Sequence, residues 1–529
     1  MRIRELLITA PLFFTIVSCN SGKDAAIAAD SINAEDISRY MEVIASDEFM
    51  GRAPATKGEE LTIKYLSEEF KRIGLLPGNG ESYLQEVPLI KKSADPKMKF
   101  EIKGAQSTLK PLFATDFVGG TPQIAEKNSF ENSEIVFVGY GIVAPEREWN
   151  DYQGIDVKGK TVIMLINDPG YATKDSALFD GKSMTYEGRW TYKFEEAARQ
   201  GAAAAIIIHE TGAAAYPWGV VENSWTNSKM YLADNMLSKS PLILQSWVTT
   251  DFAKKIFGLA GLNYEEQLVS ATKRGFKAVP MNLKASASIA SKTEYTKSNN
   301  VVALLPGNGK SDETLIYTAH WDHFGVNNSF KGDSILNGAV DNATGVAALL
   351  EIAEAFTKLG KKQDRSIVFL SVTCEEQGLL GSEYYVNHPL YPLEKCAGNI
   401  NMDGLNILGK TKDMTIIGMG KSPIEKYAIE ALKREGRYAR PDAAPEKGSY
   451  FRSDHLSFAR KGVPTLYLGN GVDNVEHGIK WGVEQMEKWI TENYHKPSDN
   501  FEPEKWNFEG MVQDIRVFFE VGYNIANAK

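Results

Sequence analysis

Short apolar segments in the second half of the chain constrain its fold most strongly. They have the length and composition of buried strands, and segments with helical periodicity separate them. The strand-like segments are Val301–Leu305, Leu315–Thr318, Ile367–Val372, Asn399–Met402, Thr415–Ile417 and Thr465–Leu468, and the helix-like segments are Val346–Leu359, Pro423–Glu435 and Gly510–Ile525. This alternation predicts an α/β domain over residues 286–529, in which helices flank a mixed β-sheet.

Side chains that bind metal ions follow the ends of these strands. They stand in groups along the chain: His320 with Asp322, Asp341 with Asn342, Glu375 with Glu376, and Asp403. In open α/β sheets, functional residues gather where strands end and loops begin. Two-metal sites hold their cations about 3.5–4 Å apart with histidine nitrogens and carboxylate oxygens. The series therefore predicts a two-metal site, and a donor set without thiolate favours Zn²⁺, with Mn²⁺ or Co²⁺ as alternatives.

A further histidine ligand is expected near the C-terminal end of the domain. His495 follows a helical stretch that Pro497 ends, whereas His477 lies in a loop rich in Gly and Asp, so we expect His495 to be the ligand. His323 and His455 are left out of the predicted metal set, because a histidine near a loop is more often a hydrogen-bonded polar residue than a ligand.

Two of these groups have simpler interpretations. Asp341 and Asn342 could cap the helix that begins near Thr344. Glu375 and Glu376 could be a solvated pair that follows a strand. The repetition of ligand-type residues after successive strands favours the metal site over both.

The N-terminal residues 1–18 have the features of an export signal. Arg2 and Arg4 precede an apolar run at Leu6–Val17, which is too short to span a bilayer, where about 20 apolar residues are needed. The segment that ends at Cys19 resembles the lipobox of bacterial lipoproteins, which implies lipidation of Cys19 and a flexible tether over residues 19–33. We therefore expect an exported protein that is lipid-anchored to the cell envelope; the alternative is a plain secretory signal.

The other cysteines and the charge exclude two classes of protein. Cys374 and Cys396 are too few for a disulfide scaffold, and two buried free thiols are preferred to a single disulfide. With 59 Lys and Arg against 68 Asp and Glu, the net charge is −9, so no overall basic field exists to hold nucleic acid. Nucleic acid is therefore not an expected partner.

The middle of the chain has a different pattern. Short β-rich runs at Ile135–Val138, Thr161–Ile166 and Ala204–Ile208 are separated by Gly, Asp and Asn. The helix and strand on either side of Gly201, together with Asp156–Lys160, resemble the protease-associated (PA) domain, a small fold inserted in several peptidases. The resemblance implies a PA-like insertion over residues 128–285, and an unrelated β-rich insertion is the alternative.

Taken in order, the motifs resemble one known family. The series is similar to that of the clan MH di-zinc exopeptidases, which include bacterial aminopeptidases and glutamate carboxypeptidase-like enzymes. Its parts are His-x-Asp at His320, Asp-Asn at Asp341, Glu-Glu at Glu375, Asp-Gly at Asp403 and Tyr-His-x-x-x-Asp at Tyr494. Ala45–Arg52 also resembles the N-terminal segment of this family, which implies that residues 34–127 belong to the peptidase domain and that the domain has the zinc-exopeptidase fold.

The resemblance implies a role for each matching residue. Asp341 corresponds to a carboxylate that bridges two zinc ions, and Glu375 corresponds to the general base. His320 and Asp403 correspond to the private ligands of one ion, and Glu376 and His495 to those of the other. The remaining matches are Asp322 as the carboxylate that orients His320, Tyr494 as a hydroxyl donor to the developing oxyanion, and Asp454 as a contact of either the substrate or the metal ligands.

The function implied is that of a zinc-dependent exopeptidase, in which two zinc ions activate a water for attack on peptide substrates. An aminopeptidase is the leading expectation, because that activity is the commoner one in the family. The alternatives are a glutamate carboxypeptidase-like enzyme, in which Arg452 could bind a terminal carboxylate, a glutaminyl cyclase, and an inactive binding receptor. The sequence leaves the direction of cleavage and the oligomeric state open.

Overall fold

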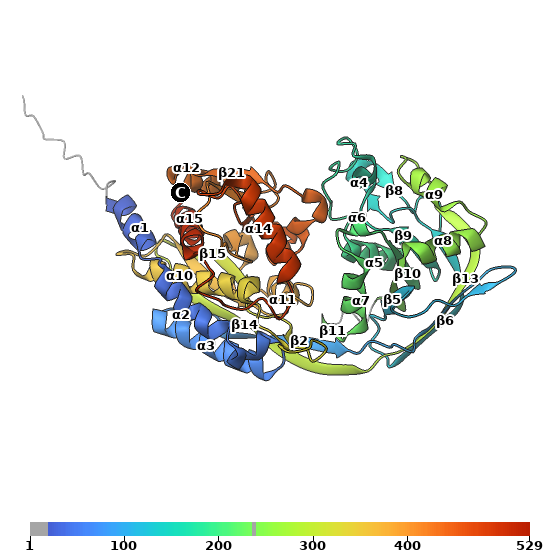
Figure 1. Ribbon diagram of the computed structural model, residues 1–529, viewed down its shortest axis with the longest axis horizontal. Coiled ribbons are helices and arrows are strands. Elements are labelled where there is room, and N and C mark those ends of the chain that lie inside the picture. Colours follow the sequence, from blue (N-terminus) through green and yellow to red (C-terminus); the bar gives the residue numbers. More distant parts are fainter. Residues whose placement is uncertain (1–19, 235–239, 529) are drawn as a thin grey trace, which may run out of the picture.

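The computed structural model describes residues 20–234 and 240–528, and it has two lobes (Figure 1). The first lobe contains a ten-stranded sheet in the order β11-β2-β14-β18-β15-β19-β22-β20-β21, with β1 paired to β14. The central strands β18, β15, β19 and β22 are parallel to one another, whereas β14 and β20 are antiparallel to their neighbours β18 and β22. The predicted α/β fold with a mixed sheet is therefore confirmed.

Six strands of this sheet, β14, β15, β18, β19, β20 and β22, overlap the predicted apolar segments, whereas β1, β2, β11 and β21 were not predicted. Their bounds are β1 Leu76–Pro77, β2 Leu84–Lys92, β11 Lys229–Leu232, β14 Thr293–Leu305, β15 Lys310–His320, β18 Arg365–Val372, β19 Cys396–Asn401, β20 Asp413–Ile416, β21 Tyr438–Pro441 and β22 Thr465–Gly469. The central strands read as continuous apolar runs because parallel strands are buried on both faces.

Helices cover the two faces of the sheet unequally. Alternate residues of β15 and β18, such as Tyr317 and Phe369, share a core with α2, α3, α10, α12 and α15, whereas Ile316 and Val368 face a smaller core with α11 and α13. These helices are α2 Ala34–Ile44, α3 Lys57–Ile73, α10 Thr344–Thr357, α11 Leu380–Asn387, α12 Glu425–Arg434, α13 His455–Arg460 and α15 Phe508–Ala526. A further helix, α14 Gly478–Glu492, leads to the segment with Tyr494 and His495.

The N-terminal part of the described chain corrects one expectation. Residues 20–30, expected to belong to a flexible tether, form the helix α1 Asn20–Asp30. Ala28 is buried, and the Arg516 guanidinium donates to the carbonyl oxygen of Ile32 at 3.2 Å, so the segment packs on the first lobe. Its alanine content, which favours a helix, explains the difference. The predicted export signal and Cys19 lie outside the described residues.

The second lobe is built on an eight-stranded sheet in the order β4-β3-β13-β6-β9-β10-β12-β5. Its strands are β3 Lys99–Lys103, β4 Thr108–Leu109, β5 Phe117–Gly120, β6 Lys127–Phe137, β9 Thr161–Leu165, β10 Ala204–His209, β12 Leu244–Thr249 and β13 Val279–Ala290. The expected helix before Gly201 is present as α5 Trp190–Arg199. Figure 1 shows the helices α7 Trp218–Thr226, α8 Thr250–Leu259 and α9 Tyr264–Ala271 around this sheet.

The boundaries of the second lobe differ from the predicted 128–285. Its sheet takes in β3 and β5, which precede residue 128 and pair with β13 and β12. Conversely, β11 lies inside the predicted insertion but pairs with β2 in the first sheet. These strands are short, and strand partners distant in sequence decide their placement, so no local pattern marks them. The long strands β2 and β14 of the first sheet extend toward the second lobe (Figure 1).

The two lobes also meet beside the end of the first sheet. Met184 and Tyr186 of the second lobe pack with Phe451 and Leu456 of the first, and the Met184 amide donates to the carbonyl oxygen of Pro445 at 3.2 Å. Among the described residues no helix is long and apolar enough to cross a membrane. Cys374 and Cys396 are both free and buried, which confirms the prediction of two free thiols.

Candidate active site

The carboxyl ends of the parallel strands bring the predicted ligands together. His320 is the last residue of β15, Glu375 and Glu376 follow β18, and Asp403 follows β19. Asp341 comes from the loop before α10, and His495 comes from the loop after α14. Because parallel strands end at the same edge of a sheet, side chains from distant parts of the sequence meet there.

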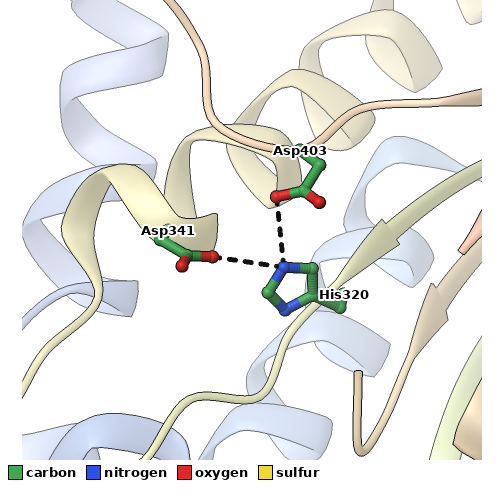
Figure 2. Close-up of side chains that lie close together, drawn as sticks. All are labelled: His320, Asp341 and Asp403. Atoms are coloured by element: carbon green, nitrogen blue, oxygen red, sulfur yellow. Dashed lines mark hydrogen bonds and ion pairs between the residues drawn. The ribbon is translucent and has the colours of Figure 1, made fainter. Parts of the chain in front are cut away.

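His320 lies at the centre of the first group of donor atoms. Its Nε2 is 3.3 Å from Asp341 Oδ1 and 3.4 Å from Asp403 Oδ1, as Figure 2 shows. Its other nitrogen, Nδ1, lies 3.2 Å from the carbonyl oxygen of Asp322, which can only accept a hydrogen bond. In a neutral ring with the proton on Nδ1, the Nε2 lone pair faces two carboxylates. A cation among the three atoms satisfies all of them.

A second group of donor atoms shares Asp341 with the first. His495 Nε2 is 3.2 Å from Asp341 Oδ2 and 3.3 Å from Glu376 Oε2. Asp341 thus directs one oxygen to each histidine, and its carboxylate lies between the two groups. This is the arrangement required of a carboxylate that bridges two cations.

The separations between these atoms test whether the residues fit a metal ion. A tetrahedral zinc ion with bonds of about 2.0–2.1 Å places its ligand atoms about 3.3 Å apart. The distances within the two groups, 3.2–3.4 Å, agree with that value. Charge-assisted hydrogen bonds between nitrogen and oxygen are shorter, at about 2.7–2.9 Å. The donor set and its spacing therefore fit two divalent cations.

The charges around the two histidines also favour bound cations. Burial opposes a charged imidazole, but the nearby Glu376 and Asp341 outweigh it and raise the pKa of His495 to about 10. In the same manner, burial is outweighed by Glu375, Asp341 and Asp403, which hold the pKa of His320 well above its usual value. The carboxylates thus favour positive charge beside both histidines. Without a metal ion, protonation of the imidazoles provides that charge.

Glu375 lies next to the donor atoms without joining either group. Its Oε2 is 4.0 Å from His320 Nε2, and its side chain is 10% exposed. Burial, together with Glu376 and Asp403, raises the pKa of Glu375 well above its usual value. A carboxylate with a raised proton affinity beside a metal site is suited to accept a proton from a nucleophile.

The carboxylate of Asp322 has a different partner from the expected one. It lies 3.8 Å from His320 Nδ1, beyond hydrogen-bond distance, and the main-chain oxygen of Asp322 takes that place. Asp322 Oδ1 instead accepts a hydrogen bond from the Glu375 amide at 3.0 Å. Asp322 therefore orients His320 through its backbone, and its side chain fixes the loop that carries Glu375 and Glu376.

Tyr494 and Asp454 differ in their exposure. The Tyr494 ring stacks on the His495 ring, with 3.7 Å between centroids, and the residue is 45% exposed. Asp454 is fully buried beside Ser453, and burial raises its pKa to about 6. The charges of His320, Asp403 and Glu376 also act on this carboxyl, which fits the alternative of a residue that supports the ligands, and contact with a substrate stays a prediction.

The sequence interpretation assigned no role to Arg52, which the structure places under the site. Its buried guanidinium donates to the carbonyl oxygens of Ile44, Trp321, Asn337 and Gly338 at distances of 2.6–2.9 Å. It thereby ties the Ala45–Arg52 segment to the loops that carry His320 and Asp341. In the sequence, only the resemblance of Ala45–Arg52 to the family pointed to Arg52. Its partners are backbone carbonyl groups, which every residue has, so they leave no sequence pattern.

Two further residues hold the ligands in place. Asp499, the last residue of the Tyr-His-x-x-x-Asp motif, accepts hydrogen bonds from the amides of Val340 and Asp341 at 3.0 and 3.2 Å. The Ser453 hydroxyl donates to Asp403 Oδ2 at 2.6 Å. Such support fixes the orientation of ligating carboxylates. Asp499 was part of the motif found in the sequence, but the sequence did not predict that Asp499 binds the segment with Asp341.

Comparison with known proteins agrees with this geometry. Residues 300–518 match the model of Peptidase family M28, so this segment is an M28 peptidase domain. The proposed ligands and Glu375 all lie within it, and the resemblance to the clan MH exopeptidases is confirmed.

Several proteins similar to this chain are named aminopeptidases. The chain is 26% identical over 254 residues to aminopeptidase YwaD of Bacillus subtilis, which covers 46% of this chain and 48% of that protein. It is 30% identical over 159 residues to aminopeptidase NAALADL1 of Mus musculus, over 29% of this chain and 19% of that protein. The match thus spans half or less of these curated relatives. The solved aminopeptidase from Aneurinibacillus sp. strain AM-1 shares the fold, with a TM-score of 0.53 and 18% identity over 95% of this chain and 96% of that chain.

The charge balance at His495 predicts how the stability of the metal-free protein depends on pH. Its pKa is about 10 in the folded protein and about 6.5 when unfolded, so its contribution is complete below pH 6.5 and is lost as the pH rises toward 10. Melting temperatures measured in EDTA should therefore fall more between pH 6.5 and 9.5 for wild type than for His495→Gln. His477→Gln, at an exposed histidine, is the control. Equal pH dependence in wild type and His495→Gln would contradict the charge assignment.

Proposed function

We propose that the protein is a zinc-dependent exopeptidase with two metal ions, and that it acts as an aminopeptidase. The observation that carries this proposal is the pair of donor groups that share Asp341, with separations matching the ligand spacing of zinc. The M28 domain supports hydrolysis of peptides, and the aminopeptidase names of the relatives support cleavage at the N-terminus.

His320, Asp341 and Asp403 would hold one cation, and Asp341, Glu376 and His495 the other. Two divalent cations in such a site supply a Lewis acid and lower the pKa of water toward 7. Glu375 accepts the proton of the attacking water and passes it to the leaving amine. Tyr494, whose ring stacks on His495, donates a hydrogen bond from its hydroxyl to the developing oxyanion.

A carboxypeptidase is the second candidate, because of Arg452. This exposed residue follows Phe451 in the segment where the lobes meet, and its guanidinium lies 5.5 Å from the ring centre of Tyr216 in the second lobe. A cation in that position suits a terminal carboxylate. A glutaminyl cyclase with one metal, or a receptor without catalysis, is disfavoured by the complete donor set and the free Glu375.

The second lobe and the N-terminus complete the proposal. We propose that the second lobe is a PA-type insertion, because α5 runs into β10 as in the resembled pattern, and that its contact with the segment before α13 helps to bound the substrate site. We further propose export and lipid anchoring through Cys19, on the sequence features of residues 1–19 alone.

Replacing the base and the bridging ligand should have different effects. Glu375→Gln should lower kcat on aminoacyl-p-nitroanilides by at least about 10²–10⁴-fold with zinc content unchanged, because an amide cannot accept the proton. Asp341→Asn should lower the zinc content as well. Elemental analysis and rates would be measured together, with Glu394→Gln, an exposed residue outside the site, as the control.

Three results would overturn parts of this account. Wild-type rates in Glu375→Gln would refute the base assignment. Wild-type protein that holds no transition metal and gains no activity with Zn²⁺, Mn²⁺ or Co²⁺ would refute the metallopeptidase. Cleavage restricted to N-blocked peptides, at a residue with a free carboxylate, would replace the aminopeptidase with a carboxypeptidase.

Cys19→Ala should move the protein from the membrane fraction to the soluble fraction, because lipidation at this residue is the proposed anchor. Cell fractionation and the mass of the mature N-terminus would be measured for both proteins. Wild-type protein that is already soluble, or that carries no lipid at Cys19, would contradict the anchor while leaving the enzyme proposal intact.

A further inference from the structure

A group of three carboxylates lies between the helices α2 and α10, outside both donor groups of the candidate active site. Asp36 comes from the first turn of α2, and Glu351 and Glu354 come from the second half of α10. One oxygen from each residue lies within 4.8 Å of the other two. The mechanism above uses none of these side chains.

Glu351 is the most deeply buried member of the group and lacks a partner. The residue is 1% exposed, and among the described residues its Oε1 accepts no hydrogen bond. Lys358, at the end of the same helix, lies 3.8 Å from Glu354 Oε2 and forms its ion pair there. A buried carboxylate oxygen without a partner is unfavourable, so Glu351 is suited to bind a cation.

The other two carboxylates have partners but keep the capacity to bind an ion. Asp36 Oδ2 accepts a hydrogen bond from Asn33 Nδ2 at 2.7 Å, and its Oδ1 accepts one from Arg39 at 3.2 Å. The Arg72 guanidinium donates to Glu354 Oε1. Each carboxylate oxygen has two lone pairs, so it can bind an ion while it accepts one hydrogen bond.

The charges around the group leave an excess of negative charge. Glu69, which is not part of the group, lies 3.7 Å from Arg39 and 2.8 Å from Arg72 and so shares both arginines. Four carboxylates thus share three cationic side chains, the two arginines and Lys358. Burial and the two neighbouring carboxylates of the group raise the pKa of Glu351 to about 8. The same surroundings that favour a proton on Glu351 favour a metal cation.

The spacing and chemistry of the group fit Ca²⁺. This ion binds oxygen ligands at about 2.3–2.6 Å, so two oxygens on one ion lie at most about 4.6–5.2 Å apart. The three carboxylate oxygens are within this limit. The group contains no histidine or thiolate, which Zn²⁺ prefers. The side chain of Asp36 is 32% exposed and lines, with Glu354, a groove of about 630 Å³, through which an ion can enter.

We propose that Asp36, Glu351 and Glu354 bind a divalent cation of the Ca²⁺ type, at a site separate from the catalytic metals. The ion joins α2 to α10, the helix that follows the Asp341 segment, and therefore stabilises the folded chain. The inference depends neither on the zinc site nor on the direction of cleavage. In the competing interpretation Glu351 carries a proton and the group binds no metal.

The test is equilibrium dialysis of the full chain, after loading with zinc, against buffered free Ca²⁺, with bound calcium measured by elemental analysis. We expect one equivalent per chain in wild type. Glu351→Gln keeps the size of the side chain but loses the charge, so half-saturation should need at least about 10-fold more Ca²⁺. Asp36→Asn should also weaken binding. Glu69→Gln, at a neighbouring carboxylate outside the group, is the matched control and should stay within a few-fold of wild type.

Melting temperatures provide a second measurement. Ca²⁺ should raise the melting temperature of wild type and Glu69→Gln more than that of Glu351→Gln, because an ion that binds only the folded chain stabilises it. Asp341→Asn separates the two kinds of metal site, since its calcium binding should equal that of wild type.

Three results would overturn the inference. Wild type that binds no calcium refutes the site and favours a protonated Glu351. Calcium that binds equally well to wild type, Glu351→Gln and Asp36→Asn lies elsewhere, and calcium lost only in Asp341→Asn lies at the catalytic site. Equal weakening in Glu69→Gln and Glu351→Gln would show a general effect of charge and refute the assigned ligands. Failure to bind zinc would refute the proposed function but not this site.

Discussion

The main constraint on this structure is the unfavourable free energy of placing four carboxylates close together in a buried site. Asp341, Glu375, Glu376 and Asp403 meet at the edge of the first sheet, and their side chains are only 6–17% exposed. Carboxylates at this separation repel one another, and burial adds a desolvation cost. The raised pKa values of His320 and His495 are the local response, since the site draws protons where it lacks cations. Two divalent ions would neutralise the same charge.

A site of closely spaced carboxylates requires the backbone segments that carry its ligands to be held in fixed positions. Parallel strands deliver His320, the Glu375–Glu376 pair and Asp403 to one edge, but Asp341 and His495 come from loops that nothing in the sheet fixes. Arg52 and Asp499 fix the Asp341 segment, because they bind its backbone from Asn337 to Asp341. In the same way, Asp322 holds the amide of Glu375 and Ser453 donates to a carboxylate oxygen of Asp403. The ligands are thus positioned mainly by contacts between loops.

Much of the fold and of the donor set was predictable for a physical reason. Buried parallel strands read as continuous apolar runs, so the ends of β15, β18 and β19 could be located, and ligand-type residues stood at each end. The supporting contacts could not be read in this way. Arg52 binds backbone carbonyls far away in the sequence, and the contact of Asp499 with the Asp341 amide depends on how its loop folds back. Short strands such as β3 and β5 were missed because their partners are distant, and α1 was missed because its Ala-rich sequence was taken for a linker.

Anomalous diffraction at the zinc edge, from crystals of the purified protein, tests the central claim most directly. The account predicts two peaks per chain about 3.5–4 Å apart, one bounded by His320, Asp341 and Asp403 and the other by Asp341, Glu376 and His495. Asp341 should contact both peaks. A single peak, or two peaks that do not share Asp341, would contradict the account.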